Sequence, residues 1–409
     1  MAKKVDLPEP IIPNNSWKIV ELGKYVKILN GYPFDSGRFT NSSENTFPLI
    51  RIRDVVRGYT ETFTDEDCPD EYKIKKDEIL IGMDGDFNIS RWKSDFGLLN
   101  QRVCKIKSAS KDLDENFLYY YLPIPLKQIN DATPSVTVKH LSSNSLQQLH
   151  FPLPTLAEQE RIVNRIETMF AKLDQAQEKA QTVLDSFETR KAAILHKAFT
   201  GQLKIDNEEL TIEDWEEKKL GEVCESIFDG DHMPPPKAES GIPFLVISNV
   251  NTGFISFDNT RYVPNDYYDS LSETRKPKKG DVLYTIVGSY GIPVLVDSDR
   301  AFCFQRHMAL LKPSKLISSR YLWYVLQSNE MYQKASSIAT GTAQLTVPIK
   351  GLRELTIPVS PPNYQLSIVN FLDTVLEKES RAKEAVQTVL DQIALLKKSI
   401  LARAFRGKI

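Results

Sequence analysis

Apolar residues recur at alternating spacings of four and three in two long stretches of the chain. The first series begins at Ile162 and ends at Ile194, and nine of its ten members are apolar, the exception being Arg190. Adding 206 to each number gives a second series, from Ile368 onward, in which only Glu379 is polar. A pattern sustained over more than four heptads predicts that both stretches are helices of a coiled coil.

The predicted helices also carry end signals. Thr155 and Glu158 have the T-x-x-E spacing of a capping box, which marks a helix start. Gly201 and Gly407 stand where a C-cap glycine is expected. Each helix then spans about 45 residues, which gives a length of about 65 Å at roughly 1.5 Å per residue.

The two helical stretches are the fixed part of an internal repeat. The sequence QTVLD at 181–185 returns at 387–391, an offset of 206. Earlier in each half the offset drifts: KKDEIL at 75–80 matches KKGDVL at 278–283 at 203, and Gln101-Arg102 matches Gln305-Arg306 at 204. The chain is therefore one unit of about 200 residues written twice, with a first part of variable length and a second part of fixed length.

The part between the helices is too small to lead the chain back along a rod of that length, because a domain of its size is about 35–40 Å across. The simplest path lays the second helix antiparallel to the first, with a globular head at each end and an approximate twofold axis between them. This pairing brings Arg190 to Glu379, and we predict an ion pair there. In the alternative, each charge reaches solvent from the edge of the seam.

Each head has the pattern of a mixed α/β domain. The fold class is therefore α+β, with two pseudo-twofold-related α/β heads separated by a long antiparallel two-helix coiled coil. In the first head, strands are predicted over 47–53, 78–83 and 102–107, and a short helix from Asp114; in the second, strands over 243–248, 281–287, 293–296 and 307–312, and a helix over 319–334. The predicted divisions are head 1–152, helix 153–200, linker 201–213, head 214–357 and helix 358–409.

Composition and charge narrow the class of protein. The chain has 409 residues, a net charge of −2 and 41% hydrophobic residues, as a globular protein has. We expect no signal peptide or membrane span, and four free thiols in the reducing cytoplasm. Because no segment is strongly cationic, nucleic-acid binding needs local patches or a basic partner.

Polar loops between the strands supply the candidate chemistry. Amide, hydroxyl and guanidinium groups on loops suit the readout of base edges, although ordinary surface loops would have the same composition. The candidate DNA-binding residues are Asn88, Arg91, Lys93, Gln101, Arg102, Thr137, Lys139, Ser289, Tyr290, Gln305, Arg306, Thr340, Gly341, Thr342, Gln344 and Lys350. The sequence has no glycine-rich phosphate loop, and its five histidines lack metal-ligand spacing, which argues against a stand-alone enzyme.

Three motifs resemble those of the specificity subunits of type I restriction–modification systems. They are P-L-P-x-x-x-E-Q-x-x-I-V at 152–163, W-x-x-x-x-L-G at the start of each head, and A-F-x-G-x-[LI] at the end of each helix. The resemblance covers nearly the whole chain. The second junction keeps Gln365 but has Tyr364 where the family usually has glutamate.

The resemblance implies a division of labour between the parts. Each head would be a target recognition domain that reads one half of a bipartite asymmetric target in double-stranded DNA. The helices would set the gap and dock two methyltransferase subunits, and restriction subunits would join them. S-adenosylmethionine, ATP and Mg would be bound by those partners, so this chain is expected to be non-catalytic. The alternative is a coiled-coil scaffold that binds proteins without DNA specificity.

Overall fold

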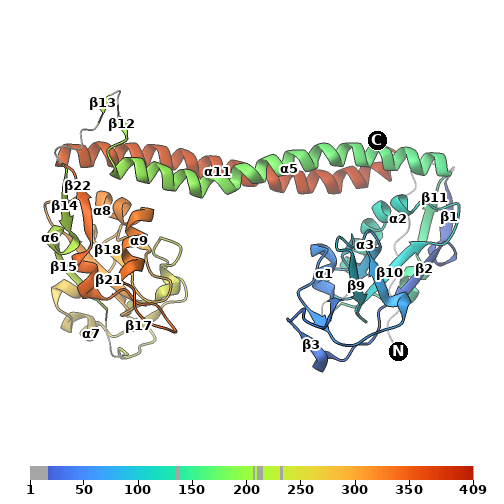
Figure 1. Cartoon of the computed structure of the whole chain (residues 1–409), viewed down its shortest axis with the longest axis horizontal. Coiled ribbons are helices and arrows are strands. Elements are labelled where there is room, and N and C mark those ends of the chain that lie inside the picture. Colours follow the sequence, from blue (N-terminus) through green and yellow to red (C-terminus); the bar gives the residue numbers. More distant parts are fainter. Residues whose placement is uncertain (1–16, 134–138, 206–207, 210–214, 231–233, 409) are drawn as a thin grey trace. The chain divides into compact units, whose positions relative to one another are not determined.

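The computed structural model of the protein describes residues 17–133, 139–205, 208–209, 215–230 and 234–408. The chain forms two compact units, one made of residues 1–180 and 388–409 and the other of residues 181–387. Each unit thus contains one head together with the nearer parts of both long helices (Figure 1).

The head of the first unit is built around an antiparallel sheet of order β2-β10-β7-β8. A second, smaller sheet of order β3-β5-β4-β9-β6 contains the parallel pair β4–β9, and β1 pairs with β11. The elements are β1 (Lys18–Glu21), β2 (Val26–Asn30), β3 (Phe39–Thr40), β4 (Phe47–Ile50), α1 (Ile52–Arg57), β5 (Phe63–Thr64), β6 (Lys73–Lys75), β7 (Ile79–Gly82), β8 (Ile89–Arg91), β9 (Phe96–Leu99), β10 (Val103–Ser108), α2 (Glu115–Tyr121), α3 (Pro123–Ala132), α4 (Ser143–Gln147) and β11 (His150–Leu153).

The head of the second unit repeats this plan. Its main sheet has the order β15-β21-β18-β19, its small sheet β17-β16-β20 contains the parallel pair β16–β20, and β14 pairs with β22. The elements are β14 (Glu216–Lys219), α6 (Leu220–Val223), β15 (Cys224–Asp229), β16 (Ile242–Leu245), β17 (Arg261–Val263), α7 (Asn265–Ser270), β18 (Val282–Thr285), β19 (Pro293–Leu295), β20 (Cys303–Phe304), β21 (Met308–Pro313), α8 (Ser319–Leu326), α9 (Asn329–Ile338), α10 (Ile349–Glu354) and β22 (Thr356–Val359). The segment predicted as a linker contains a short hairpin, β12 (Lys204–Ile205) with β13 (Glu208–Glu209).

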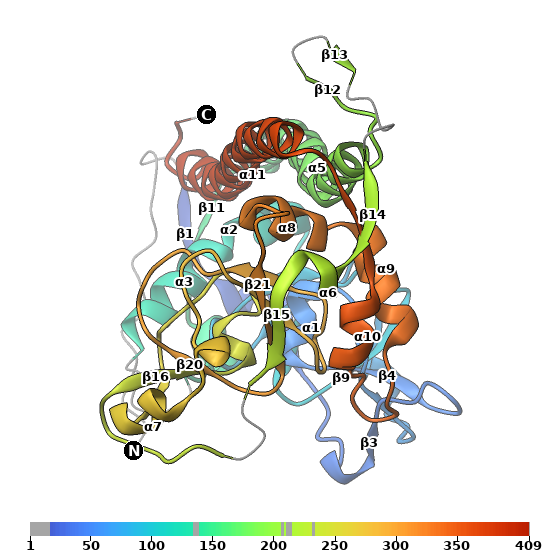
Figure 2. The same cartoon turned by 90° about the vertical axis from the view of Figure 1, so that its left-hand side faces the viewer.

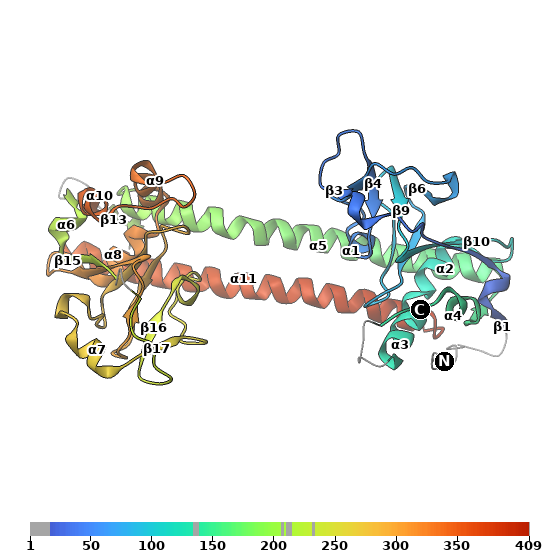
Figure 3. The same ribbon diagram turned by 90° about the horizontal axis from the view of Figure 1, so that it is seen from below.

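Two helices carry the fixed-length part of the repeat, α5 (Leu156–Phe199) and α11 (Pro362–Ala404). Within each unit they run antiparallel, as Figure 3 shows. In the second unit Glu188 pairs with Lys383 at 2.9 Å, so later residues of α5 meet earlier residues of α11. In the first unit Lys397 pairs with Asp174 at 2.5 Å. The antiparallel pairing inferred from the sequence is thus present in both units.

The predicted contact between the two polar seam residues is present. Nη2 of Arg190 lies 2.9 Å from Oε2 of Glu379, and the same guanidinium lies over the ring of Phe187 at 4.3 Å. The Glu379 oxygen is nevertheless buried without a well-directed hydrogen bond in the described structure. We therefore treat the contact as an ion pair and not as a hydrogen bond. Its side chains are 44% and 28% exposed, so its contribution to stability is small.

The seam is not buried along its whole length, contrary to the simple coiled-coil expectation. Ile162 and Ile368 are at most 1% exposed because each also packs against the core of its own head. In contrast, Val183, Val389 and Leu396 are 41%, 45% and 50% exposed. A pair of helices covers only one side of each seam residue, and these three do not belong to the core of either head.

The helix ends agree with the sequence signals in part. Gly201 and Gly407 both have a positive φ, 69° and 66°, as a C-cap requires. At the start of α5 the N–H of Glu158 donates to the Thr155 hydroxyl at 3.4 Å, which is half of the predicted capping box. The other half is missing, because the Glu158 carboxylate pairs with Arg161 at 2.8 Å. Glu158 and Arg161 are three residues apart, so they lie on the same face of the helix and their opposite charges attract.

A buried glutamine joins each head to its helix. Gln159 is 0% exposed; its Oε1 accepts from the N–H of Asp114 at 2.8 Å. Its Nε2 donates to the carbonyls of Asp112 and Pro154 at 2.8 and 2.9 Å. In the second unit, Gln365 makes the equivalent three bonds at 2.8–3.0 Å. The glutamine of the junction motif is therefore a structural clamp.

The short helix that receives this clamp also separates the sheet from the long helices. In the second unit α8 lies between the strands and the paired helices (Figures 1 and 2). Its Tyr321 is fully buried and meets Phe199 of α5 edge to face, with ring centroids 5.4 Å apart. One apolar core thus holds the head against the helices within this unit.

Candidate nucleic-acid interface

A tight turn between β9 and β10 presents the first pair of candidate residues. The N–H of Val103 donates to the carbonyl of Asn100 at 2.9 Å, and the Asn100 side chain accepts from the N–H of Gln101 at 2.8 Å. Gly31 approaches so closely that a Cβ there would lie 2.0 Å from the Asn100 carbonyl oxygen. Backbone contacts fix this turn, while the side chains of Gln101 and Arg102 remain exposed.

The second unit has the same turn between β20 and β21. The N–H of Met308 donates to the carbonyl of Gln305 at 3.1 Å, and Gly230 takes the place of Gly31. A Cβ on Gly230 would lie 2.3 Å from the carbonyl oxygen of Phe304. The exposed side chain of Arg306 and the half-buried ring of His307 follow.

These hydrogen bonds correct the alignment of the repeat at the turn. They make Gln305 the counterpart of Asn100 and His307 the counterpart of Arg102, an offset of 205. The offset of 204 predicted from the dipeptide Gln-Arg is therefore wrong by one residue. The two Gln-Arg dipeptides therefore occupy places in the turn that differ by one residue, although their letters are identical.

A hollow of about 450 Å³ lies beside the turn of the first unit. Its lining residues are Ser36, Phe39, Arg51, Ile52, Arg53, Asn100, Gln101, Arg102 and Val103. Three guanidinium groups therefore share one concave surface. Arg102 lies 3.6 Å from the carboxylate of Asp84, which also contacts His140 at 2.6 Å. The net charge of the surface remains positive, as contact with DNA requires.

Two of these arginines were missed by the sequence analysis. The segment 47–53 reads as one strand, but β4 ends at Ile50 and the chain turns into α1 at Ile52. The parallel ladder with β9 comprises only Leu49 and Ile50, so nothing holds the next residues in the sheet. Arg51 and Arg53 consequently leave the sheet and reach the hollow.

The corresponding hollow of the second unit measures about 440 Å³ and uses a different wall. It is lined by Asp229, Ile286, Val287, Arg306, His307, Gln344, Thr346, Val347, Pro348 and Ile349. Burial, with a further contribution from Arg306, lowers the pKa of His307. The imidazole is therefore neutral at physiological pH and has one donor and one acceptor nitrogen for a partner. Arg306 and Gln344, both predicted candidates, are thus brought together here.

Other candidates of the first head are largely committed to the fold. Arg91 donates to the carbonyl of Asp77 at 2.8 Å and to Asn116 at 2.7 Å. Its guanidinium lies 5.0 Å from the centre of the Tyr119 ring. The ammonium of Lys139 donates to the carbonyl of Asn130 at 2.7 Å. Asn88 and Lys93 are exposed on and after the β7–β8 hairpin, away from the lining of the hollow. Thr137 lies outside the described residues.

The candidates of the second head fall into two neighbouring loops. Backbone bonds between Thr340 and Thr346 at 2.9 and 2.7 Å close the loop that carries Gly341, Thr342 and Gln344. The N–H of Gly288 donates to Leu345 at 2.9 Å, which ties this loop to the one bearing Ser289 and Tyr290. Tyr290 itself stacks on Tyr332 and donates to Ser336, and is therefore a structural residue. Lys350 is exposed on α10.

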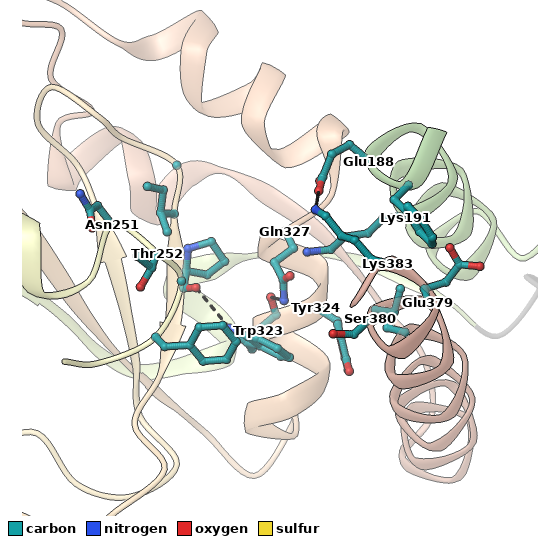
Figure 4. Close-up of a pocket in the computed structure, with 17 residues that line it drawn as sticks. Glu188, Lys191, Asn251, Thr252, Trp323, Tyr324, Gln327, Glu379, Ser380 and Lys383 are labelled. Carbon is teal, nitrogen blue, oxygen red and sulfur yellow. Dashed lines mark hydrogen bonds and ion pairs between the residues drawn. The ribbon is translucent and has the colours of Figure 1, made fainter. Parts of the chain in front are cut away.

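A further hollow, of about 610 Å³, lies between the head and the helices of the second unit (Figure 4). Its wall combines Trp323 and Tyr324 of α8 with charged residues of α5 and α11. Glu188 of α5 and Lys383 of α11 pair on the helix side of the hollow (Figure 4). Burial lowers the pKa of Lys191, with a smaller contribution from Lys383 and against the opposing effect of Glu188. The charged groups already serve helix pairing, so this hollow belongs to the junction between head and helices.

The part of the chain that the structure describes has neither a metal-binding cluster nor a membrane-spanning helix. Within it, no three histidine, cysteine, aspartate or glutamate side chains are grouped so that they could hold a metal ion. None of the helices described is long and apolar enough to cross a membrane. The turn is the feature that the two heads share, whereas the hollow beside it has a different wall in each head.

The chain thus consists of two similar heads, each of which presents a loop surface of its own. The family described as "type I restriction modification DNA specificity domain" matches residues 14–184 and again residues 212–390. Each matched segment contains one head and part of the helix that follows it. The chain therefore belongs to the DNA specificity family of type I restriction–modification systems.

Curated relatives and solved structures agree with this assignment. The chain is 32% identical to the EcoBI specificity subunit of Escherichia coli over 97% of this chain and 87% of that one. It is 25% identical to the MjaVIII specificity subunit of Methanocaldococcus jannaschii over 96% and 93%. The fold is similar to a chain of a solved type I restriction–modification system (TM-score 0.70, 19% identity, 98% and 100% covered). It is also similar to the HsdS subunit of Thermoanaerobacter tengcongensis (TM-score 0.54, 19% identity, 97% and 98% covered).

Proposed function

We propose that this chain is the DNA-recognition subunit of a type I restriction–modification complex, in which each head reads one half of a bipartite asymmetric target. The repeated turn and its hollow carry the proposal. The same backbone turn presents Gln101 and Arg102 in one unit and Arg306 and His307 in the other. A conserved frame with different side chains at its tip is what two heads need in order to read two different half-sites.

The long helices act as a spacer and as a docking surface for two methyltransferase subunits. In the first unit α11 leaves Val389, Leu395 and Leu396 45%, 64% and 50% exposed. In the second unit Val183 of α5 is 41% exposed. Apolar side chains on a helix are stabilised when a partner helix covers them. These exposed apolar faces of the paired helices would thus accept the two methyltransferase subunits.

The chemistry of the complex resides on those partners. We expect the methyltransferase subunits to bind S-adenosylmethionine and to methylate adenine in each half-site. Restriction subunits would bind ATP and Mg and translocate DNA. This chain supplies the sequence selection, and the near-neutral net charge of −2 implies that the partners contribute to clamping the phosphate backbone.

Mapping methylated adenines tests the proposal. The chain is expressed with its methyltransferase subunit in a host that lacks other adenine methylation, and the genome is sequenced for modified bases. We expect one asymmetric motif made of two half-sites with a fixed gap. In binding assays, affinity for this motif should fall steeply with salt. A scaffold without DNA specificity would give no motif and binding that is independent of sequence, and either outcome would overturn the proposal.

A further inference from the structure

Arg51 and Arg53 are held at the hollow of the first head by one buried carboxylate. The Oδ2 of Asp54 accepts from the N–H of Arg51 at 2.9 Å, and the N–H of Asp54 donates to the Arg51 carbonyl at 2.9 Å. This reciprocal pair closes the turn by which the chain leaves β4 for α1. Both arginines line the hollow beside Gln101 and Arg102.

The second oxygen of Asp54 has no role in that turn. The residue is 1% exposed, and its Oδ1 has no hydrogen-bond partner in the described part of the chain. The nearest cation is Arg53, whose Nε lies 3.8 Å from this oxygen. An unpaired buried carboxylate oxygen costs free energy, so its retention calls for a compensating interaction. The guanidinium of Arg53 supplies it.

The second head shows that the turn itself does not need a carboxylate. There the side chain of Asn249 accepts from the N–H of Val246 at 3.0 Å, and the N–H of Asn249 donates to the Val246 carbonyl at 2.9 Å. This is the same turn at an offset of 195, with Val246 in place of Arg51 and Ser248 in place of Arg53. A neutral amide therefore suffices for this turn in the second head, where the preceding residue is Ser248 and not an arginine. The negative charge of Asp54 is therefore matched to Arg53.

The guanidinium of Arg53 is fixed on two sides and free on the third. Its Nη2 donates to the buried hydroxyl of Thr62 at 2.9 Å, and its Nε faces Asp54. Of the five N–H bonds of a guanidinium, this leaves three, all on Nη1 and Nη2. The side chain is still 54% exposed. A fork held in this way presents two parallel donors to an external partner without further loss of side-chain entropy.

We propose that Arg53 and Arg51 read the edge of a guanine base in the half-site of the first head, and that Asp54 positions Arg53. This inference rests on the proposed function. Guanine presents two acceptors, O6 and N7, that match a guanidinium fork, whereas phosphate contacts tolerate loosely held lysines. Three guanidinium groups and Gln101 then form one reading surface. The second head, with Val246 and Ser248 at these places, lacks this element and reads its half-site through Arg306, His307 and Gln344.

Three variants of the first head and one of the second test the inference through the methylated motif. Arg53→Ala and Arg53→Lys should relax selectivity at one guanine of one half-site by roughly 10- to 100-fold, the range of a bidentate contact. Lysine keeps the charge but not the fork, so it should fail like alanine. Asp54→Asn keeps the turn, as Asn249 demonstrates, and should relax the same guanine by a smaller factor. Ser248→Ala is the matched control and should leave both half-sites unchanged.

The outcomes that overturn the inference are distinct from those that overturn the proposed function. If Arg53→Ala weakens binding equally for all sequences while Arg53→Lys restores it, Arg53 contacts phosphate and the inference is wrong. The same holds if the motif and affinity are unchanged in Arg53→Ala. It also holds if the relaxed position lies in the half-site of the second head, which a further variant, Arg306→Ala, identifies. If the unmodified chain directs no bipartite motif at all, the proposed function itself fails.

Discussion

Replacing the buried glutamine at the first junction should loosen the head from its helix. In the variant Gln159→Leu the side chain keeps about the same volume but can neither donate nor accept. The N–H of Asp114 and the carbonyls of Asp112 and Pro154 then lose their partners. The affected groups join the end of the main sheet, the start of α2 and the start of α5, so the damage is concentrated where three elements meet.

The size of the effect follows from these three bonds. A hydrogen bond contributes about 1 kcal/mol net, and a buried polar group left without a partner costs roughly 1–3 kcal/mol. Pro154 is buried, whereas Asp112 is exposed and its carbonyl can bind water instead. We therefore expect a loss of about 3 kcal/mol. For a unit of this size, 1 kcal/mol shifts the unfolding midpoint by about 2–4 °C, so the first unit should unfold about 6–12 °C lower.

Thermal unfolding combined with hydrogen exchange measures this change. The amide of Asp114 should lose protection in Gln159→Leu, while the amide of Ser318, held by Gln365 in the second unit, should keep it. Gln175→Leu, an exposed change on the same helix, is the matched control and should shift neither. If Gln159→Leu unfolds with the control and Asp114 stays protected, the glutamine is not a clamp and the reasoning is refuted.

Other predictions concern single contacts. A double-mutant cycle on Arg190 and Glu379 should give a coupling free energy of about 0.5 kcal/mol that falls with added salt, because both side chains are partly exposed. A coupling of zero, or one that salt leaves unchanged, would contradict the ion pair. Burial raises the pKa of Cys104 and of Cys224 to about 12, so neither thiol should react with iodoacetamide at pH 8 until the protein unfolds. Rapid alkylation of either of these two thiols in the native protein would refute their burial. Gly31→Ala should destabilise the first unit by several kcal/mol and abolish reading of its half-site, because the new Cβ would lie 2.0 Å from the Asn100 carbonyl oxygen. An unchanged unfolding midpoint and an unchanged methylated motif would show that the turn can relax.

Sequence reasoning succeeded where one physical rule acts over a long stretch. The alternating spacing of apolar residues predicted both long helices, because burying one face of a helix imposes that period on the sequence. The antiparallel direction followed from the length of the connection, and the pairing of Arg190 with Glu379 followed from the direction. The exposure of Val389 and Leu396 was not foreseen, because the pattern cannot tell an occupied seam from one that awaits a partner.

The candidate site was harder to predict, because its placement depends on where strands end. Apolar and basic residues alternate over 50–53 as they do in a strand. The exit of the chain from the sheet is decided there by the two-residue ladder with β9 and by the cap from Asp54. Arg91 has the residue type of a base reader but is held by Tyr119 and Asn116. Residue type suggested candidates, but only the fold separates exposed arginines from those that support it.

Shortening both helices tests the central claim most directly. Deleting residues 179–185 of α5 and 385–391 of α11 removes one heptad from each and preserves the seam period. The deletion also removes Val183 and Val389 but keeps Leu395 and Leu396, so binding of the methyltransferase subunit to the shortened chain is measured first. The heads should approach by about 10 Å, or up to about three base pairs of DNA. With the methyltransferase subunit present, the methylated motif should keep the letters of both half-sites and have a gap shorter by about one to three base pairs. A motif with new half-site letters, or with the original gap, would contradict the account.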